Sequence, residues 1–390
     1  MSNNQRLWNQ TFITTLFITF LCNSSHQMSN ATLALFVDSN GGSAGFSGLL
    51  AVSLAIAAIA FRFVSGSLFD RIGGKLILAV GGLLYALASL MYPVLSLLWP
   101  TLLLRFLQGV GYSAVNTTAT AIAAKNSPPS RLGEGMSYFG VMTALGSAIG
   151  PSLGVYVWRT SGNQALFTVM ALINVVIALV GGFGKTNTAA TISKPEKPEN
   201  PFRGLRLDSP QVKSAIVTMM ITIPQSFIFT YVIQYGEIKD CGIADYFFTF
   251  SAIAMVFSRF LFGKSYDRYG AKRTLFPALA TGSISLLLLC FSPNSFGFVA
   301  GAVLYGICYG VAIPILSAES VRMAPKNQQG SALAVYYVGY DVGIGIGALF
   351  WGILIDAAGY TPVILIAALF LIAAVGAWIR IEKQGRTLSL

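Results

Sequence analysis

Long apolar runs alternate with short polar segments along the whole chain. A membrane-spanning helix needs about 20 predominantly apolar residues, and the sequence contains twelve runs of roughly this length or longer. The expected spans are residues 10–37, 44–69, 76–95, 98–124, 132–157, 165–184, 211–235, 244–264, 274–292, 296–322, 328–356 and 361–381. The pattern therefore predicts an all-α membrane protein with twelve transmembrane helices.

One polar interval is longer than the others. Residues 185–210, between the sixth and seventh spans, contain the charged and proline-rich sequence KPEKPENP, a composition typical of a linker. We therefore expect three parts: a six-helix half at 1–184, a cytoplasmic linker at 185–210 and a second six-helix half at 211–390.

The distribution of Lys and Arg predicts the orientation. Cytoplasmic loops carry an excess of both residue types. With the N-terminus in the cytoplasm, 20 of the 25 basic residues fall in inner loops, tails and the linker or at the cytoplasmic ends of spans, and two fall in outer loops. Both termini are therefore expected in the cytoplasm. The apolar run after Arg6 lacks a small-residue cleavage site, so we interpret it as a retained first helix.

A charged loop occurs twice. Residues 62–75 read RFVSGSLFDRIGGK, and residues 259–272, which begin 197 positions later, read RFLFGKSYDRYGAK; seven of the fourteen positions are identical. The same offset relates Gly109, Tyr112, Gly146 and Gly150 to Gly306, Tyr309, Gly343 and Gly347. The two halves are thus predicted to be pseudo-symmetric parallel repeats, with a substrate path between them near the midplane.

Composition agrees with a bilayer environment. Hydrophobic residues make up 55% of the chain and charged residues 10%, against about 25% charged in soluble proteins. The net charge is +11, but the basic residues punctuate apolar runs instead of clustering on a polar face, which argues against nucleic-acid binding. The four cysteines are scattered, so we expect no metal site, and nothing indicates a cofactor.

Three segments carry a family resemblance. GSLFDRIGGK (66–75) resembles the loop signature between helices two and three of the major facilitator superfamily, and LLLRFLQGVG (102–111) resembles its fourth-helix signature. GSAIGPSLG (146–154) is similar to the fifth-helix signature of the drug/proton antiporter branch, although Val155 replaces the usual final glycine. With the twelve spans and the repeat, the resemblance extends over nearly the whole chain and implies the major facilitator fold.

The resemblance also implies roles for these segments. The duplicated loop would latch the cytoplasmic side in the outward-facing state, and solvated turns that only set topology are the alternative. The gate candidates are Asp70, Arg71, Gly73 and Lys75, and in the second copy Asp267, Arg268, Gly270 and Lys272. Gly146, Gly150 and Gly154 line one helix face beside Pro151, which predicts either a static packing seam or a hinge or seal between the halves; in the resembling branch this motif accompanies efflux.

Two ionisable residues inside spans are candidates for coupling. Asp341, near the middle of the eleventh span, is costly when ionised and is a candidate proton carrier or acceptor for a cationic substrate; a fixed structural hydrogen-bonding role is the alternative. Arg105, inside the fourth span, needs a partner, a water-filled cavity, or a path for snorkelling to the surface. In the family, an arginine in this signature is implicated in proton transfer.

Polar groups in other spans complete the candidate site. The island CNSSHQMSN in the first span places Asn23, His26 and Asn30 on one helical face, predicted to line a cavity; His26 is either a proton shuttle or a packing residue. Glu134 and Glu319 have an arginine nearby, so ion pairs are the alternative to a coupling role. The second half adds amides and aromatics, namely Gln225, Phe229, Tyr231, Gln234, Tyr305, Tyr309, Tyr336, Tyr337 and Tyr340.

These features predict a secondary transporter in the cytoplasmic (inner) membrane. We expect proton-coupled export of a small, amphipathic or cationic organic molecule by a monomer through alternating access. Proton-coupled uptake and flipping of a lipid-linked substrate are alternatives with the same fold, and a transport-inactive membrane sensor is an alternative of another class. No HExxH, GxSxG or P-loop motif occurs, so an enzyme is not expected.

Overall fold

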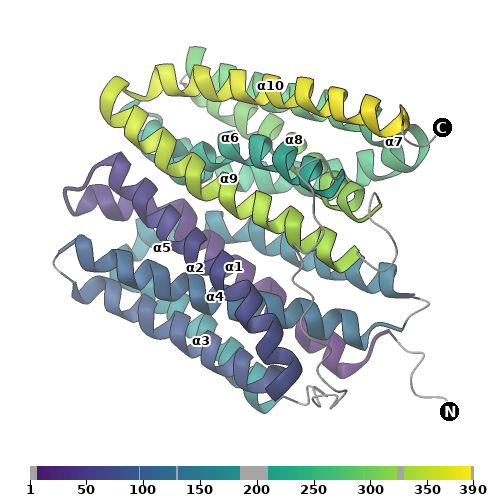
Figure 1. The fold of residues 1–390 in the computed structure, drawn as a ribbon. Coiled ribbons are helices and arrows are strands. Elements are labelled where there is room, and N and C mark those ends of the chain that lie inside the picture. The colour runs from purple at the N-terminus through teal and green to yellow at the C-terminus, as the bar shows by residue number, and fades with distance from the viewer. Residues whose placement is uncertain are drawn as a thin grey trace. The chain divides into compact units, whose positions relative to one another are not determined.

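The computed structural model of the protein describes a chain whose regular elements are helices, traced from α1 to α10 in Figure 1. The described residues are 7–95, 97–128, 131–184, 210–292, 294–322 and 329–387. By their contacts, they divide into two compact units, the first within 1–32 and 53–198 and the second within 33–52 and 199–390. Apart from its last residue, the predicted linker lies outside the described residues.

The first unit is built around α3. Its elements are most of α1 (Gln10–Ser39) and α2 (Ala44–Ile72), then α3 (Gly74–Met91), the short 3-10 helix η1 (Tyr92–Val94), α4 (Trp99–Asn126) and α5 (Leu132–Phe183). Helix α3 packs against both α4 and α5. Helix α5 is interrupted at Gly162, so it consists of two helical segments.

The second unit contains the remaining helices and one hairpin from the first part of the chain. Its elements are α6 (Pro210–Ile238), η3 (Ala244–Tyr246), α7 (Phe247–Phe291), α8 (Ser295–Arg322), α9 (Gln329–Ala358) and α10 (Tyr360–Thr387). Helix α7 packs on α8 and α6 packs on α9, while α10 contacts α6 and α7. Residues 33–52, the end of α1 and the start of α2, also belong to this unit.

Glycines at equivalent positions turn the chain in the same way. Gly73 has φ 78° and ψ 171° before α3, and Gly270 has φ 77° and ψ 172° inside α7. Gly162 and Gly359 have φ 79° and 77°. Residues with a side chain rarely adopt such φ values, so these turns favour glycine. Both pairs are separated by 197 residues, the offset at which the sequence repeats.

A close helix contact also occurs twice at this offset. A Cβ atom on Gly109 would lie 2.5 Å from the carbonyl oxygen of Leu54, and one on Gly306 would lie 2.3 Å from that of Ser251. Helix α4 therefore approaches α2 as α8 approaches the first segment of α7, because glycine leaves room for the facing backbone. The two units share local structure as well as sequence.

The outward faces of the helices are apolar. On α3, Leu76, Val80, Leu83, Leu87 and Leu90 are exposed at intervals of three or four residues, whereas the opposite face is buried against α4 and α5. An exposed apolar stripe of this length is unfavourable in water and fits a helix that faces lipid.

Seven segments of the described chain are long and apolar enough to cross a membrane. The number of twelve spans stays a prediction. Helices α1 and α4 exceed 18 residues but are not among the seven, because both carry many polar side chains. Most of those side chains are buried inside the unit, which is where a membrane protein can accommodate them.

Candidate functional site: a buried polar network and an intramembrane acid

The polar island of α1 faces the interior of the first unit. Asn23, Ser24, Ser25, Gln27, Ser29 and Asn30 are buried, and His26 is partly buried. The His26 ring stacks on Tyr112 of α4, with ring centroids 4.0 Å apart and an interplanar angle of 15°. These side chains therefore lie inside the unit, and their role in lining a cavity stays a prediction.

Arg105 is the centre of the polar network. Its side chain is fully buried (0% exposed), so it does not snorkel to the surface. The guanidinium donates from Nη1 to Ser29 Oγ and to Gln108 Oε1 (3.1 Å), and from Nη2 to Asn30 Oδ1 (2.5 Å). Its Nε atom is buried and has no acceptor among the described residues.

Other amides and hydroxyls hold the acceptors of Arg105 in place. Gln108 Nε2 donates to Ser89 Oγ at 3.0 Å, and the Tyr92 hydroxyl lies 3.4 Å from Gln108 Oε1. On the α1 side, Asn30 Nδ2 contacts Gln27 Oε1 at 2.8 Å and His26 Nε2 at 3.2 Å. The network thus connects α1, α3, α4 and η1, and its members orient one another.

A glycine seam brings α5 against the back of the polar island. Cβ atoms on Gly146, Gly150 and Gly154 would lie 2.7 Å from Phe20 O, 2.4 Å from Ser24 O and 2.9 Å from Met28 Cα. The seam therefore joins α5 to α1 of the same unit, a close contact that small residues permit. A role of these glycines and Pro151 as a hinge stays a prediction.

The second unit places an acid beside a group of tyrosines. Asp341, near the middle of α9, is partly buried and interacts electrostatically with Tyr336 and Tyr340. Tyr305 and Tyr309 of α8 lie with ring centroids 4.6 Å apart. Gln225, which is 2% exposed, interacts with Tyr305 and Tyr340.

Not all predicted aromatic and amide candidates join this group. The Tyr231 hydroxyl instead lies 2.7 Å from Ala348 O and 3.0 Å from Ala44 O. Gln234 accepts a hydrogen bond from the Tyr360 hydroxyl at 2.8 Å. Tyr337, in contrast, lies next to the group: its ring centroid is 5.3 Å from that of Tyr336, and it interacts electrostatically with Tyr340. The sequence could not separate these residues, because residue type and helical spacing do not show which neighbouring helix each side chain meets.

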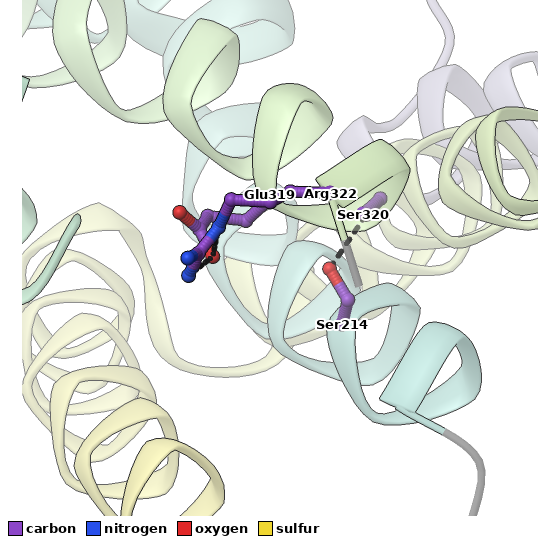
Figure 2. A network of polar contacts seen from close by, with 4 residues as sticks. All are labelled: Ser214, Glu319, Ser320 and Arg322. Carbon is purple, nitrogen blue, oxygen red and sulfur yellow. Dashed lines mark hydrogen bonds and ion pairs between the residues drawn. The ribbon is translucent and has the colours of Figure 1, made fainter. Parts of the chain in front are cut away.

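The carboxylates of Glu134 and Glu319 form ion pairs. Arg131 binds both oxygens of Glu134 at 2.7 Å in an exposed position, and this interaction raises the pKa of Arg131. Glu319 is 3% exposed and pairs with Arg322 at 2.6 Å. Figure 2 shows this pair next to the contact between Ser214 and Ser320, whose Oγ atoms are 2.6 Å apart. A proton-coupling role for Glu134 stays a prediction.

The gate loops are described in part. Arg71 and Lys75 are exposed beside the turn at Gly73, and Gly270 forms the equivalent turn in α7. The side chains of Asp70, Asp267, Arg268 and Lys272 lie outside the described part of the chain. The latch function of these loops stays a prediction.

Asp356, at the last turn of α9, is a residue that sequence reasoning missed. Its carboxylate accepts hydrogen bonds from the backbone N–H groups of Ala44 (3.0 Å) and Gly45 (2.8 Å), the first residues of α2. The next amide, Phe46 N–H, lies 3.3 Å from Ser43 Oγ. The amides that begin a helix have no intrahelical acceptors, and here a carboxylate that is distant in sequence is their acceptor.

Helices α2 and α9 meet at their backbones beside this cap. A Cβ atom on Gly48 would lie 2.4 Å from Leu349 Cα, and one on Gly352 would lie 2.4 Å from Ala44 O. We call the residues of this contact, 44–48 with 348–356, the α2–α9 junction. It lies within the second unit, at the end of α2 that is opposite to the charged loop.

Apolar helix surfaces around buried polar groups define the class: a multi-pass helical membrane protein with ionisable residues in its interior. The sequence profile of the Major Facilitator Superfamily matches residues 15–264 and 242–388. The chain belongs to this superfamily.

Relatives agree with the assignment. The chain is 27% identical over 271 residues to the uncharacterized MFS-type transporter YhhS of Escherichia coli (strain K12), a match that covers 69% of this chain and 64% of YhhS, just under two thirds of that protein's length. It is 22% identical over 385 residues to the uncharacterized MFS-type transporter MJ1560 of Methanocaldococcus jannaschii, covering 97% of each chain.

Solved structures agree as well. A mutant form of the nucleoside transporter NupG superposes with a TM-score of 0.80 at 14% identity, over 95% of this chain and 100% of that one. A mutant form of the peptide transporter POT, in complex with sulfate, gives a TM-score of 0.75 at 14% identity, over 98% of this chain and 97% of that one. At these identities the likeness shows the fold.

Proposed function

We propose that the protein is a secondary active transporter that exports a small organic molecule in exchange for protons. Membership of the superfamily and the transporters among its relatives support transport as the activity. The residue that carries the proposal of proton coupling is Asp341, a carboxyl group partly buried in the middle of α9 among tyrosines. A carboxyl group inside a bundle is neutral when protonated and costly when ionised, so its protonation responds to an arriving charge.

In the proposed mechanism, the two six-helix halves rock about a site near the midplane. Asp341 binds either a proton or the substrate, which couples their movement in opposite directions. The aromatic rings around it suit an amphipathic or cationic molecule, because aromatic faces attract cations and bury apolar groups.

The mechanism assigns roles to the ends of the bundle. With the protein in the inner membrane and both termini in the cytoplasm, the charged loops at Gly73 and Gly270 close the inner side. The α2–α9 junction then lies on the outer side, where its contacts have to separate for the substrate to leave.

The test is proton release by purified protein in detergent on addition of candidate cationic and zwitterionic compounds. Wild type should release protons with compounds that it binds, and Asp341→Asn should not. Asp240→Asn is the matched control, because Asp240 is exposed and has φ 52°, a conformation that asparagine tolerates well. The control should behave as wild type.

Other outcomes decide between the alternatives. Equal release by wild type and Asp341→Asn assigns coupling to another group and contradicts the role of Asp341. Binding without release, followed by uptake along a proton gradient in liposomes, supports symport. No response to any water-soluble compound favours a lipid-linked substrate or a transport-inactive sensor.

A further inference from the structure

The charge of Arg105 lacks a counter-charge among the described residues of its unit. All its hydrogen bonds there go to neutral side chains, Ser29, Asn30 and Gln108. Each of these acceptors is itself buried, so solvent does not compensate the charge either. A fully buried guanidinium surrounded by neutral groups is a strongly unfavourable arrangement unless an anion completes it.

The described part of the unit does not supply this anion from its interior. Between residues 53 and 184 the only acidic residues are Asp70 and Glu134, and residues 1–32 contain none. Asp70 is in the last turn of α2, next to the start of α3, whereas Arg105 lies near the start of α4. Glu134 follows the opposite end of α4, about 30 Å along the helix axis from Arg105, and is paired with Arg131.

The hydrogen-bond network leaves donors unused. Arginine can only donate, so the Asn30 atom that faces Arg105 must be Oδ1, and its Nδ2 therefore faces Gln27 and His26. His26 Nε2 is then an acceptor, and in the neutral ring the proton is on Nδ1. That Nδ1 is buried without a partner among the described residues, as is Nε of Arg105.

The unused donors of Arg105 lie on two neighbouring nitrogen atoms of the guanidinium, Nε and Nη2. Nη2 of Arg105 donates one of its two protons to Asn30, so Nη2 keeps a second proton, and the neighbouring Nε–H has no acceptor among the described residues. These two groups belong to one edge of the guanidinium, which is the geometry that binds two oxygens of a carboxylate or phosphate together. Buried donors without acceptors are rare in folded proteins, so this edge and His26 point to a ligand that brings acceptors and negative charge.

We propose that the network around Arg105 binds the oxyanion of the transported substrate, a carboxylate or phosphate group of a small organic molecule. This inference deepens the proposed function and rests on it. Arg105 binds two oxygens through Nε and Nη2, and the Nδ1–H of His26 is a further donor for the same anion.

The experiment compares matched anionic and neutral probes by thermal stabilisation and equilibrium binding in detergent. The probes are benzoate and benzamide for a carboxylate, and phenyl phosphate with inorganic phosphate for a phosphate. Wild type should bind one of the organic anions at least about tenfold more tightly than benzamide, because a charge-assisted bidentate contact is lost in the neutral molecule. Which anion binds distinguishes the carboxylate from the phosphate, and binding of inorganic phosphate alone contradicts an organic substrate.

Variants test whether Arg105 is the binding group. Arg105→Lys keeps the charge but removes the paired donors, and should weaken anion binding about tenfold or more; Arg105→Gln should abolish the preference for the anion. His26→Gln, which leaves Arg105 in place, should reduce the affinity for the anion by a smaller factor. This variant tests the proposal if both Arg105 variants fail to fold. Arg159→Gln, at an exposed site of the same unit, is the control and should bind as wild type.

Two results would overturn the inference. One is equal affinity of wild type for the anionic and neutral probes. The other is a double variant, Arg105→Gln with Asp341→Asn, that is as stable as wild type although each single variant is destabilised. That result would identify Asp341 as the counter-ion of Arg105. Failure of the proposed function is distinguishable from both, since it would appear as anion binding by wild type without any proton-linked flux in liposomes.

Discussion

The cap on α2 supplied by Asp356 leads to a quantitative prediction. Asp356→Ala removes the acceptor for the N–H groups of Ala44 and Gly45. Loss of an N-cap acceptor costs about 0.5–2 kcal/mol, and loss of a carboxylate at a helix N-terminus costs about 0.3–1 kcal/mol when it is solvent-exposed. Since Asp356 is exposed, we expect the closed form of the α2–α9 junction to lose about 1–2 kcal/mol of stability. This loss raises the population of the open form by a factor of about 5–30.

Hydrogen exchange measures this change at the affected amides. In Asp356→Ala, the peptide that covers residues 43–48 should exchange about 5–30 times faster than in wild type, while peptides from α3 and α4 should keep their rates. Asp356→Asn keeps one acceptor oxygen and should give an intermediate rate. Asp240→Asn, which alters an exposed acid of the same unit outside the junction, should leave the peptide unchanged.

Unaltered exchange at residues 43–48 in Asp356→Ala would show that water or Ser43 satisfies these amides equally well, and would refute the cap as a stabilising contact. Uniformly faster exchange over the whole chain would refute it too, because it would indicate global destabilisation instead of local opening.

Two further predictions concern the first unit. Gly150→Ala should destabilise the protein by about 1–3 kcal/mol, because the added Cβ would lie 2.4 Å from Ser24 O. Gly140→Ala, on the same helix, is the control and should be neutral or stabilising, because no atom lies within 4 Å of the new Cβ. Equal melting temperatures for the two variants would contradict the seam. Glu134→Gln should leave proton release and melting temperature close to those of wild type, because its ion pair with Arg131 is exposed; loss of proton release would return Glu134 to the coupling machinery.

Sequence reasoning anticipated the helical character and the gathering of polar side chains on one face of α1, because both are local properties. The positions of Asn23, His26 and Asn30 at helical spacing place them on one face whatever the neighbouring helices are. The turns at Gly73 and Gly270 could be expected from the repeated loop, and the same offset could have located the turns at Gly162 and Gly359.

Long-range partners could not be read from the sequence. Asp356 looks like an ordinary acid at a helix end, and only the fold brings it to α2, whereas the cap from Ser43 is adjacent to its helix and could have been inferred. The neutral surroundings of Arg105 depend on which faces of α1, α3 and α4 meet. A count of acidic residues in the first half would nevertheless have shown that a carboxylate partner from that half is absent from the middle of the spans.

Residues 33–52 are continuous with the first unit along the chain but pack with the second. Helices α1 and α2 continue from this hairpin into the first unit, so they hold it near its contacts with α9, and its effective concentration there is not set by diffusion. Weak contacts suffice to dock a tethered segment, and weak contacts can also be released rapidly. In the proposed mechanism, two backbone hydrogen bonds to one exposed carboxylate suit a closure that forms and breaks during transport.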